Sequence, residues 1–141
     1  MDQSEKIIIE NQLRKHHTLT IIGWFRRIRA LAKCQSTGKN IIVDANVKLL
    51  RFPQKISIGH QVIIKEGTRI CPTNENASIT IGDRTTIGYH TMIFSSINIS
   101  IGDDCLIAPF CYLIDSNHQI NKNIKINEQA IEAESIEIQN D

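Results

Sequence analysis

The chain has 141 residues, which is enough for one domain. Its 16 basic and 15 acidic side chains leave a formal net charge of +1, so charge gives no reason to expect a nucleic-acid partner. No apolar run could span a bilayer and no cleavable signal peptide is evident, so we expect a cytoplasmic protein, alternatively one held at the inner face of the membrane.

The N-terminal segment, 1–40, differs from the rest and is predicted to be a helical cap. Residues 13–33 have a helical pattern, although Gly23 interrupts it. Basic residues crowd this stretch, and no acidic residue lies between Glu10 and Asp44. One interpretation is a helix that covers the end of the domain with its arginines in solvent. The other is an amphipathic helix that makes a peripheral contact with an anionic membrane surface. We favour the cap, because the repeats that follow need a covered end.

Aliphatic residues recur at every sixth position through the middle of the chain. The residues that begin these units are Ile58, Ile64, Ile70, Ile81, Ile87, Ile93, Ile101, Ile107 and Leu113. Position five of each unit is small; its residues are Val62, Thr68, Thr85, Thr91, Cys105 and Cys111. Neither a helical period nor strict alternation explains this spacing. The sequence therefore contains an internal repeat, which determines the architecture.

A short extended segment followed by a tight corner explains the six-residue period. The aliphatic and the small residue point inward, and we expect the Gly that often stands at position two to permit the corner. Three such sides close a triangular coil, and stacked coils pair their strands at about 4.8 Å. Residues 73–78 are extra to the repeat and predict a longer excursion at one corner.

Four cysteines do not predict a disulfide framework. Cys105 and Cys111 lie one repeat apart at inward positions, so packing explains their spacing. Cys34 and Cys71 have no C-x-x-C partner, and no metal site is expected.

The repeat stops after His118. Residues 119–135 are polar and predict an excursion loop that protrudes from the coils, or partly a short helix at 128–134. Residues 136–141 look like the start of a further coil, with Gln139 where Gly would be expected. The repeating region is thus predicted to span 41–118.

These hexads resemble the left-handed parallel β-helix of the hexapeptide-repeat acyltransferases. The resemblance implies an all-β solenoid of hexapeptide repeats with an N-terminal helical cap, and its left hand is an exception to the usual rule for parallel crossovers. Segment 101–118 resembles the sugar O-acetyltransferases, of the galactoside and maltose and of the capsule and lipopolysaccharide types. Members of that family continue with more coils, so we expect a C-terminally truncated chain.

The resemblance implies a catalytic role for His118. In the family a histidine follows the coil that reads Ile-Gly-Asp and Leu-Ile-Ala-Pro here, and it precedes an excursion. An alcohol needs a base to take its proton as it attacks a thioester carbonyl, and imidazole suits that task at neutral pH. The oxyanion that forms needs nearby hydrogen-bond donors. Asp115 could orient the imidazole, and Ser116 stands where His is common.

Acceptor binding is expected from His90, Ser95, Ser96 and Asn117. His90 stands where the galactoside enzymes carry Asn, and Ser95 and Ser96 stand where they carry acidic residues. The expected reaction moves an acetyl group from acetyl-CoA, as co-substrate, to a sugar hydroxyl of a surface polysaccharide or its precursor. The resemblance also implies a homotrimer with acetyl-CoA between subunits, its binding residues mostly in coils absent from this sequence.

Two alternatives remain open. The chain could be a catalytically inactive solenoid that acts only in self-association, because an unpaired coil edge invites pairing. It could instead be an acyltransferase with the same base and an amine or serine acceptor.

Overall fold

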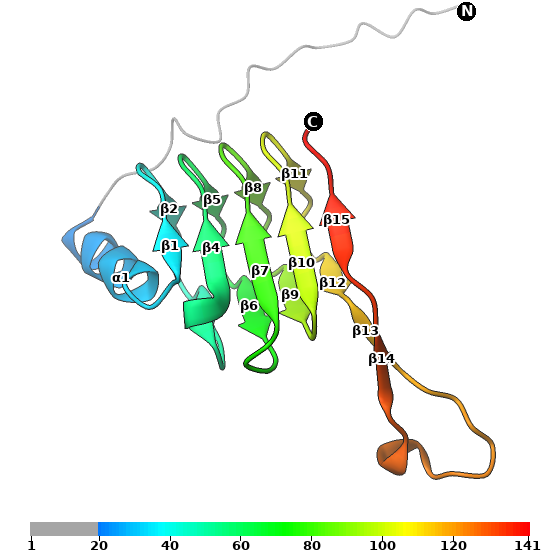
Figure 1. Cartoon of the computed structure of the whole chain (residues 1–141). Coiled ribbons are helices and arrows are strands. Elements are labelled where there is room, and N and C mark those ends of the chain that lie inside the picture. Colours follow the sequence, from blue (N-terminus) through cyan, green and yellow to red (C-terminus); the bar gives the residue numbers. More distant parts are fainter. Residues whose placement is uncertain (1–19) are drawn as a thin grey trace, which may run out of the picture.

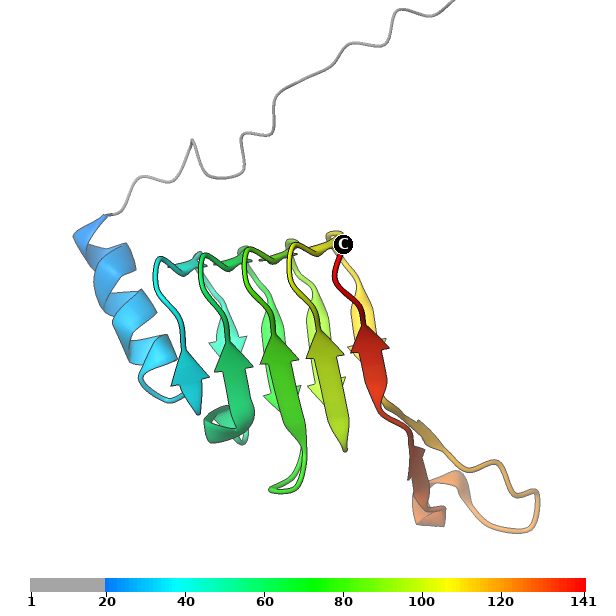
Figure 2. The ribbon, with the colours of Figure 1, turned by 45° about the horizontal axis from the view of Figure 1, so that its top comes forward.

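In the computed structural model of the protein, residues 20–141 can be described, and within them the chain forms a parallel β-solenoid of about four turns with one N-terminal helix. The part of the expected cap that falls on 1–19 lies outside the described residues. The coils stack in a row between the helix and a protruding hairpin (Figures 1 and 2). This architecture confirms the predicted fold class and is consistent with a left-handed β-helix.

Three parallel sheets form the sides of the solenoid; the first four coils contribute one strand to each sheet, and the start of a fifth coil adds one more strand to sheet 1. Sheet 1 has the order β1 (Ser36–Thr37), β4 (Ile56–Ile58), β7 (Ser78–Ile81), β10 (Asn98–Ile101), β15 (Ile136–Ile138). Sheet 2 has the order β2 (Ile42–Val43), β5 (Ile63–Ile64), β8 (Thr86–Ile87), β11 (Leu106–Ile107). Sheet 3 has the order β3 (Lys48–Leu49), β6 (Arg69–Pro72), β9 (Met92–Ser95), β12 (Tyr112–Ile114).

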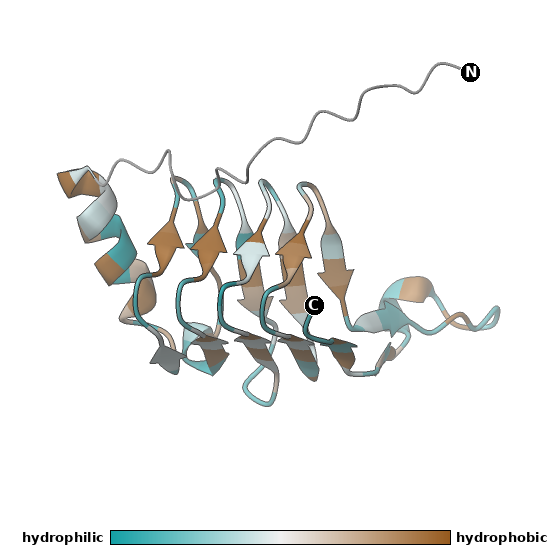
Figure 3. Ribbon diagram, turned by 90° about the horizontal axis from the view of Figure 1, so that it is seen from above, coloured by the Kyte–Doolittle hydropathy of each residue, from teal (hydrophilic) through white to brown (hydrophobic). Residues whose placement is uncertain are grey.

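The interior of the prism is filled by stacked aliphatic side chains. In sheet 1, Ile58 pairs with Ile81, and Ile81 with Ile101, so identical residues lie above one another. Each of these three is at most 3% exposed. Figure 3 shows how hydrophobic residues follow the strands from coil to coil. Burial of each such side chain contributes about 1.5–3 kcal/mol, and this core is what the hexad pattern predicted.

Threonines at position five are buried without a loss of hydrogen bonding. The hydroxyls of Thr68, Thr85 and Thr91 donate to the carbonyls of Gly88, Gly102 and Ala108, at 2.7–3.0 Å. Each bond reaches the next coil, so these threonines tie neighbouring coils together while they occupy the space of a small apolar residue. A buried hydroxyl without a partner would be costly.

Glycine at position two has a different role from the one expected. Positive φ falls two residues further on, at position four, where Gln61, Arg84 and Asp104 have φ of 57–59°. Gly82 instead lies against the next coil, and a Cβ added there would be 2.5 Å from the carbonyl carbon of Gly102. The glycines are therefore required by close coil stacking, and the strained backbone of the corner is carried by residues with side chains.

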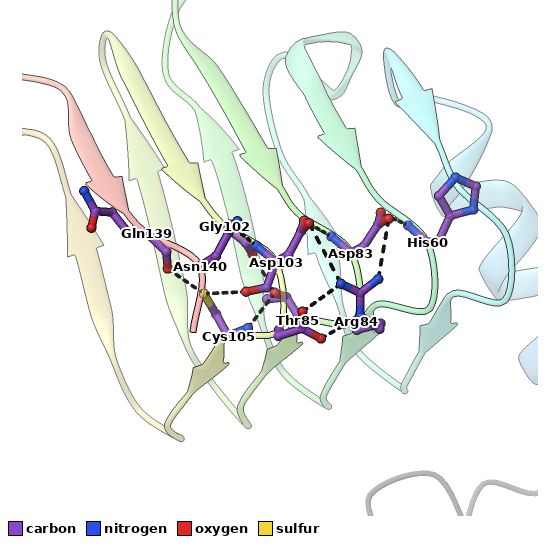
Figure 4. Close-up of polar contacts among 10 residues, drawn as sticks. His60, Asp83, Arg84, Thr85, Gly102, Asp103, Cys105, Gln139 and Asn140 are labelled. Atoms are coloured by element: carbon purple, nitrogen blue, oxygen red, sulfur yellow. Dashed lines mark hydrogen bonds and ion pairs between the residues drawn. The ribbon is translucent and has the colours of Figure 1, made fainter.

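Side chains at the corner between sheets 1 and 2, the first corner, form a ladder between coils (Figure 4). The Asp83, Asp103 and Asn140 side chains each accept a hydrogen bond of 2.7 Å from a backbone N–H of the preceding coil. The His60 ring accepts in the same way from the Lys39 N–H, at 3.0 Å. His60 is thus a structural residue of the first corner.

Arg84 neutralises the acidic side chains that this ladder brings together. Its guanidinium donates two hydrogen bonds to Asp104, at 2.6 and 2.7 Å, and lies within 3.9 Å of Asp83 and Asp103. The pairing holds the pKa of Asp104 below its usual range. All four side chains are well exposed, so their contribution to stability is small.

Helix α1 (Ile21–Leu31) lies at the start of the solenoid, beside β1. Its N-cap is Thr20, whose hydroxyl accepts from the Gly23 N–H at 3.1 Å. β1 begins inside the segment assigned to the cap, so the coils start at residue 36 instead of 41. The two-residue strand has exposed side chains and carries no hexad signal, which is why sequence reasoning missed it. No described helix is long and apolar enough to cross a membrane.

The remaining corners hold the irregular segments. A short 3-10 helix, η1 (Pro53–Lys55), turns the chain into β4, and residues 73–77 form the expected excursion between β6 and β7. After β12 the chain leaves the solenoid as a hairpin of β13 (Ser116–His118) and β14 (Ile131–Ala133), with a 3-10 turn, η2 (Ile126–Glu128), near its tip. Of the short helix considered for 128–134, only Glu128 is helical, as the last residue of η2, whereas residues 131–133 pair as strand β14.

Candidate functional site

The β13–β14 hairpin leaves the solenoid at the corner between sheets 3 and 1, the third corner, and His118 is the last residue of β13, next to the loop of the hairpin. The hairpin projects from the end of the solenoid opposite α1 (Figure 1). The strands are antiparallel, with Asn117 opposite Glu132 and His118 opposite Ile131. His118 is therefore on an ordered strand with a fixed neighbour, in a segment for which the sequence predicted a loop or a helix.

The His118 side chain is exposed and lines a groove of about 450 Å³. Asn117, Gln119 and Glu132 line the same groove. Among residues 20–141 the imidazole forms no hydrogen bond or ion pair with another side chain. Its ring nitrogens are accordingly open to a proton donor that approaches from the groove.

Asp115 does not contact His118. It is 5% exposed, and its carboxylate accepts from the Ser95 hydroxyl at 2.8 Å and from three backbone N–H groups. Those groups belong to Ser96, Ile97 and Asn98, at 2.6–3.0 Å. Its side chain is thus fully engaged within the third corner. In this structure Asp115 fixes the turn between β9 and β10, in place of the expected orientation of the imidazole.

The two serines expected to bind the acceptor also belong to this corner. Ser95 is 0% exposed, so it presents no surface to a substrate and instead supports Asp115. Ser96 is half-buried, and its hydroxyl donates to the Ser116 hydroxyl at 3.0 Å and lies 3.1 Å from that of Thr73. A row of hydroxyls from successive coils therefore leads to the first residue of β13.

His90 lies on another corner, between sheets 2 and 3, with φ of 53°. Its ring stacks on Phe110, with 5.2 Å between the ring centroids and 19° between the planes. The structure therefore does not bring His90 to His118. Asn117, by contrast, is the immediate neighbour of His118 and is exposed. Of the expected acceptor-binding residues, Asn117 is the one that the structure places in the groove with the histidine.

Two acidic residues of the hairpin were missed by sequence reasoning. Glu132 and Glu134 line a second groove of about 600 Å³ with Asn117 and Ser116. The Glu132 carboxylate accepts from the Gln119 side chain at 2.7 Å, so it lies between the two grooves. The segment from 119 to 135 has no periodicity, and nothing in the sequence indicates that β14 returns to pair with β13.

Cys34 and Cys71 are not activated nucleophiles. Burial raises the pKa of the Cys34 thiol to about 11, and burial also raises the pKa of Cys71. Both thiols are therefore protonated at neutral pH, and a protonated thiol is a poor nucleophile. Residues 20–141 hold no group of three or more side chains suited to a metal ion.

No protein-family model matches the chain. It is similar to the probable acetyltransferase Rv3034c of Mycobacterium tuberculosis, with 28% identity over 95 residues that cover 67% of this chain and 30% of that protein.

Solved structures with a similar fold include those of AntD, an N-acyltransferase from Bacillus cereus. The complex with dTDP and 3-hydroxybutyryl-CoA has a TM-score of 0.65 at 17% identity, over 82% of this chain and 62% of AntD. A variant of AntD in complex with dTDP and coenzyme A has a TM-score of 0.67 at 16% identity, with the same coverage. At this identity the likeness shows the fold alone. The chain spans only part of the length of each of these proteins.

Proposed function

We propose that this chain acts in an acyl-CoA-dependent acyltransferase that acetylates a sugar hydroxyl on a surface polysaccharide or its precursor. The observation that carries the proposal is the placement of His118: exposed, at the end of an ordered strand, in a groove beside the loop of the hairpin. The similarity to a probable acetyltransferase and to a CoA-binding acyltransferase fold supports the donor.

In the proposed reaction His118 acts as the general base. Its imidazole takes the proton of the acceptor hydroxyl while the oxygen attacks the carbonyl carbon of acetyl-CoA. Formation of the C–O bond gives a tetrahedral intermediate, and its collapse breaks the C–S bond. The imidazolium then gives its proton to the departing CoA sulfur. Asn117, which shares the groove, would hydrogen-bond the acceptor. No acyl-enzyme is needed, because both substrates are bound together.

A nitrogen acceptor is the second candidate, and one observation favours it. AntD is an N-acyltransferase, and its complexes contain dTDP. The same base can remove a proton from an amine after the nitrogen attacks. The role of His118 would therefore be the same for both acceptors, and only the residues that bind the acceptor would differ. Radiolabelled acetyl-CoA incubated with a panel of sugars and of amino sugars linked to dTDP separates the two.

His118→Ala is the test of the base. We expect kcat to fall by about 10²- to 10⁴-fold without a change in Tm, because the exposed ring supports no other residue. His60→Asn is the matched control, because Asn140 shows that an asparagine can accept the ladder hydrogen bond at that position. A variant that keeps its acetylation rate after loss of the imidazole would refute general-base catalysis by His118.

The donor and the assembly are tested separately. Calorimetric titration with acetyl-CoA tests whether this chain holds enough of the donor site: saturable binding would support the proposal, and no detectable heat would leave the inactive, self-associating solenoid as the better description of this chain. The homotrimer implied by the resemblance and the cytoplasmic location expected from the sequence remain predictions. Sedimentation equilibrium measures the first, and cell fractionation the second.

A further inference from the structure

Helix α1 presents large apolar side chains to solvent. Exposure is 77% for Ile21, 72% for Ile22, 44% for Trp24, 62% for Phe25 and 43% for Ile28. No residue of the helix is fully buried. A helix that only covered the end of the solenoid would turn these residues inward, so their exposure needs another explanation.

The contacts of α1 show which side faces the solenoid. Leu31 packs against the core, and the Arg27 guanidinium donates to the Ile41 carbonyl at 3.3 Å. Ile21, Phe25 and Ile28 follow one another at helical spacings of four and three residues, so they form a single face. This face is the apolar face of α1. Trp24 lies three residues before Arg27 and seven before Leu31, so it stands at the border between the apolar face and the side that contacts the solenoid. Ile22 lies on the other border, on the side of Arg26 and Arg29.

Positive charge accompanies this apolar face. Arg26 and Arg29 are exposed on the helix, and the exposed Lys33 follows it. No acidic residue occurs from 11 to 43, so the positive charge of the helix is not balanced by neighbours in the sequence. An apolar face with an aromatic residue and a basic border is the pattern of helices that lie in the interface of an anionic bilayer.

We propose that α1 docks the protein on an anionic lipid bilayer, with its apolar face among the lipid headgroups and Arg26 and Arg29 against lipid phosphates. The 11-residue helix is about 16 Å long, roughly half the hydrocarbon thickness, so it lies along the surface. The hairpin with His118 is at the opposite end of the solenoid and would point away from the bilayer (Figure 2). This docking does not depend on the proposed acetyl transfer.

Trp24 provides a direct probe, because it is the one tryptophan in the sequence. The full chain is titrated with vesicles of phosphatidylcholine alone and with vesicles that contain roughly one quarter phosphatidylserine. We expect a blue shift of Trp24 fluorescence and co-flotation only with the anionic vesicles, both weakened by salt. Arg26→Gln with Arg29→Gln should weaken binding about 25-fold, at about five-fold for each charge. Phe25→Ser should weaken it about ten-fold or more.

Lys122→Gln with Lys125→Gln is the matched control, because it removes two exposed charges from the hairpin and should leave vesicle binding unchanged. Circular dichroism checks that each variant keeps its fold. Absence of a fluorescence shift with anionic vesicles would overturn the proposal, as would equal loss in the control variant. If Phe25→Ser instead dissociates an oligomer in the absence of lipid, the face is an interface between copies of the chain and the bilayer proposal is wrong.

Discussion

Gly82 illustrates how closely neighbouring coils approach at the first corner. A Cβ at this position would lie 2.4 Å from the Asp103 carboxylate and 2.5 Å from the Gly102 carbonyl carbon. Backbone atoms of a stacked coil cannot move away without a loss of strand pairing. We expect Gly82→Ala to lower the free energy of unfolding by about 2–3 kcal/mol, measured by urea denaturation.

Gln139→Ala is the matched control for this prediction. Gln139 occupies the same corner position in the last described coil, and its side chain is exposed. Its replacement should change the free energy of unfolding by less than about 0.5 kcal/mol. If both variants were equally stable, close stacking of the coils would not be the reason for glycine at this position.

We predict that Asp115 stabilises the third corner and has no direct role in catalysis. Asp115→Asn places an amide NH₂ among four donors, so at least one buried N–H or hydroxyl loses its acceptor. We expect a loss of about 2–4 kcal/mol in the free energy of unfolding. Asp83→Asn is the control, since Asn140 fills the equivalent role, and it should have a much smaller effect. A stable Asp115→Asn variant with reduced kcat would restore the orienting role expected from the sequence.

At the residue scale, the sequence predicted burial correctly where the six-residue period alone determines whether a side chain points inward. The inward positions of Ile81, Ile87 and Thr85 follow from spacing, and all three are buried. The prediction failed where the role of a polar side chain depends on a hydrogen-bond partner from another coil. Ser95 and Asp115 lie 20 residues apart, and their hydrogen bond is visible only once the third corner is built. Ser95 was therefore assigned to the substrate and Asp115 to the imidazole of His118, although the two side chains bind each other.

The loop of the β13–β14 hairpin is held mainly by one side chain. The Gln129 amide accepts from the Asn121 N–H at 2.7 Å and donates to the carbonyls of Asn121 and Ile124. The hairpin is otherwise exposed, and it contributes little to the core. We expect Gln129→Ala to speed tryptic cleavage at Lys122 and Lys125 about ten-fold, with the urea midpoint of the solenoid unchanged.

Asn127→Ala serves as the comparison, because Asn127 is an exposed residue of the same loop whose side chain makes no hydrogen bond with residues 20–141. Its cleavage rate should match that of the unaltered protein. Cleavage of Gln129→Ala at the unaltered rate would mean that the strand pairing of β13 and β14 alone determines the order of the loop.

At the scale of elements, the repeating strands and the helical character of α1 were predictable, and the hairpin was not. Each hexad makes the same inward contacts with the neighbouring coil, so one pattern in the sequence predicts all the strands from β4 to β12. The hairpin occurs once, and its pairing joins residues that share no period. The helical pattern of α1 was correctly identified, but the direction of its apolar face depends on how Leu31 and Arg27 meet the first coil.

The whole molecule is a row of coils in which each strand of a sheet bonds only its neighbours. In sheet 1, β7 and β10 have a strand on both sides, whereas β1 and β15 are the outermost described strands. Stability in such a row is close to a sum of coil and interface contributions, so opening should begin at its ends. The predicted order of opening therefore follows position along the row, independently of the chemistry at His118.

Hydrogen exchange monitored by mass spectrometry measures this order. We expect peptides from α1 and from the hairpin to exchange first, those covering β1 and β15 next, and those covering β7 and β10 last, with about ten-fold or greater protection of the central strands over the outer ones. The aliphatic residues of β7 and β10 that face the interior are at most 1% exposed, whereas those of β15 are only half-buried. Equal protection in all coils would show that the solenoid opens as one cooperative unit, because the stacked isoleucine core then couples the coils more strongly than pairwise strand contacts imply.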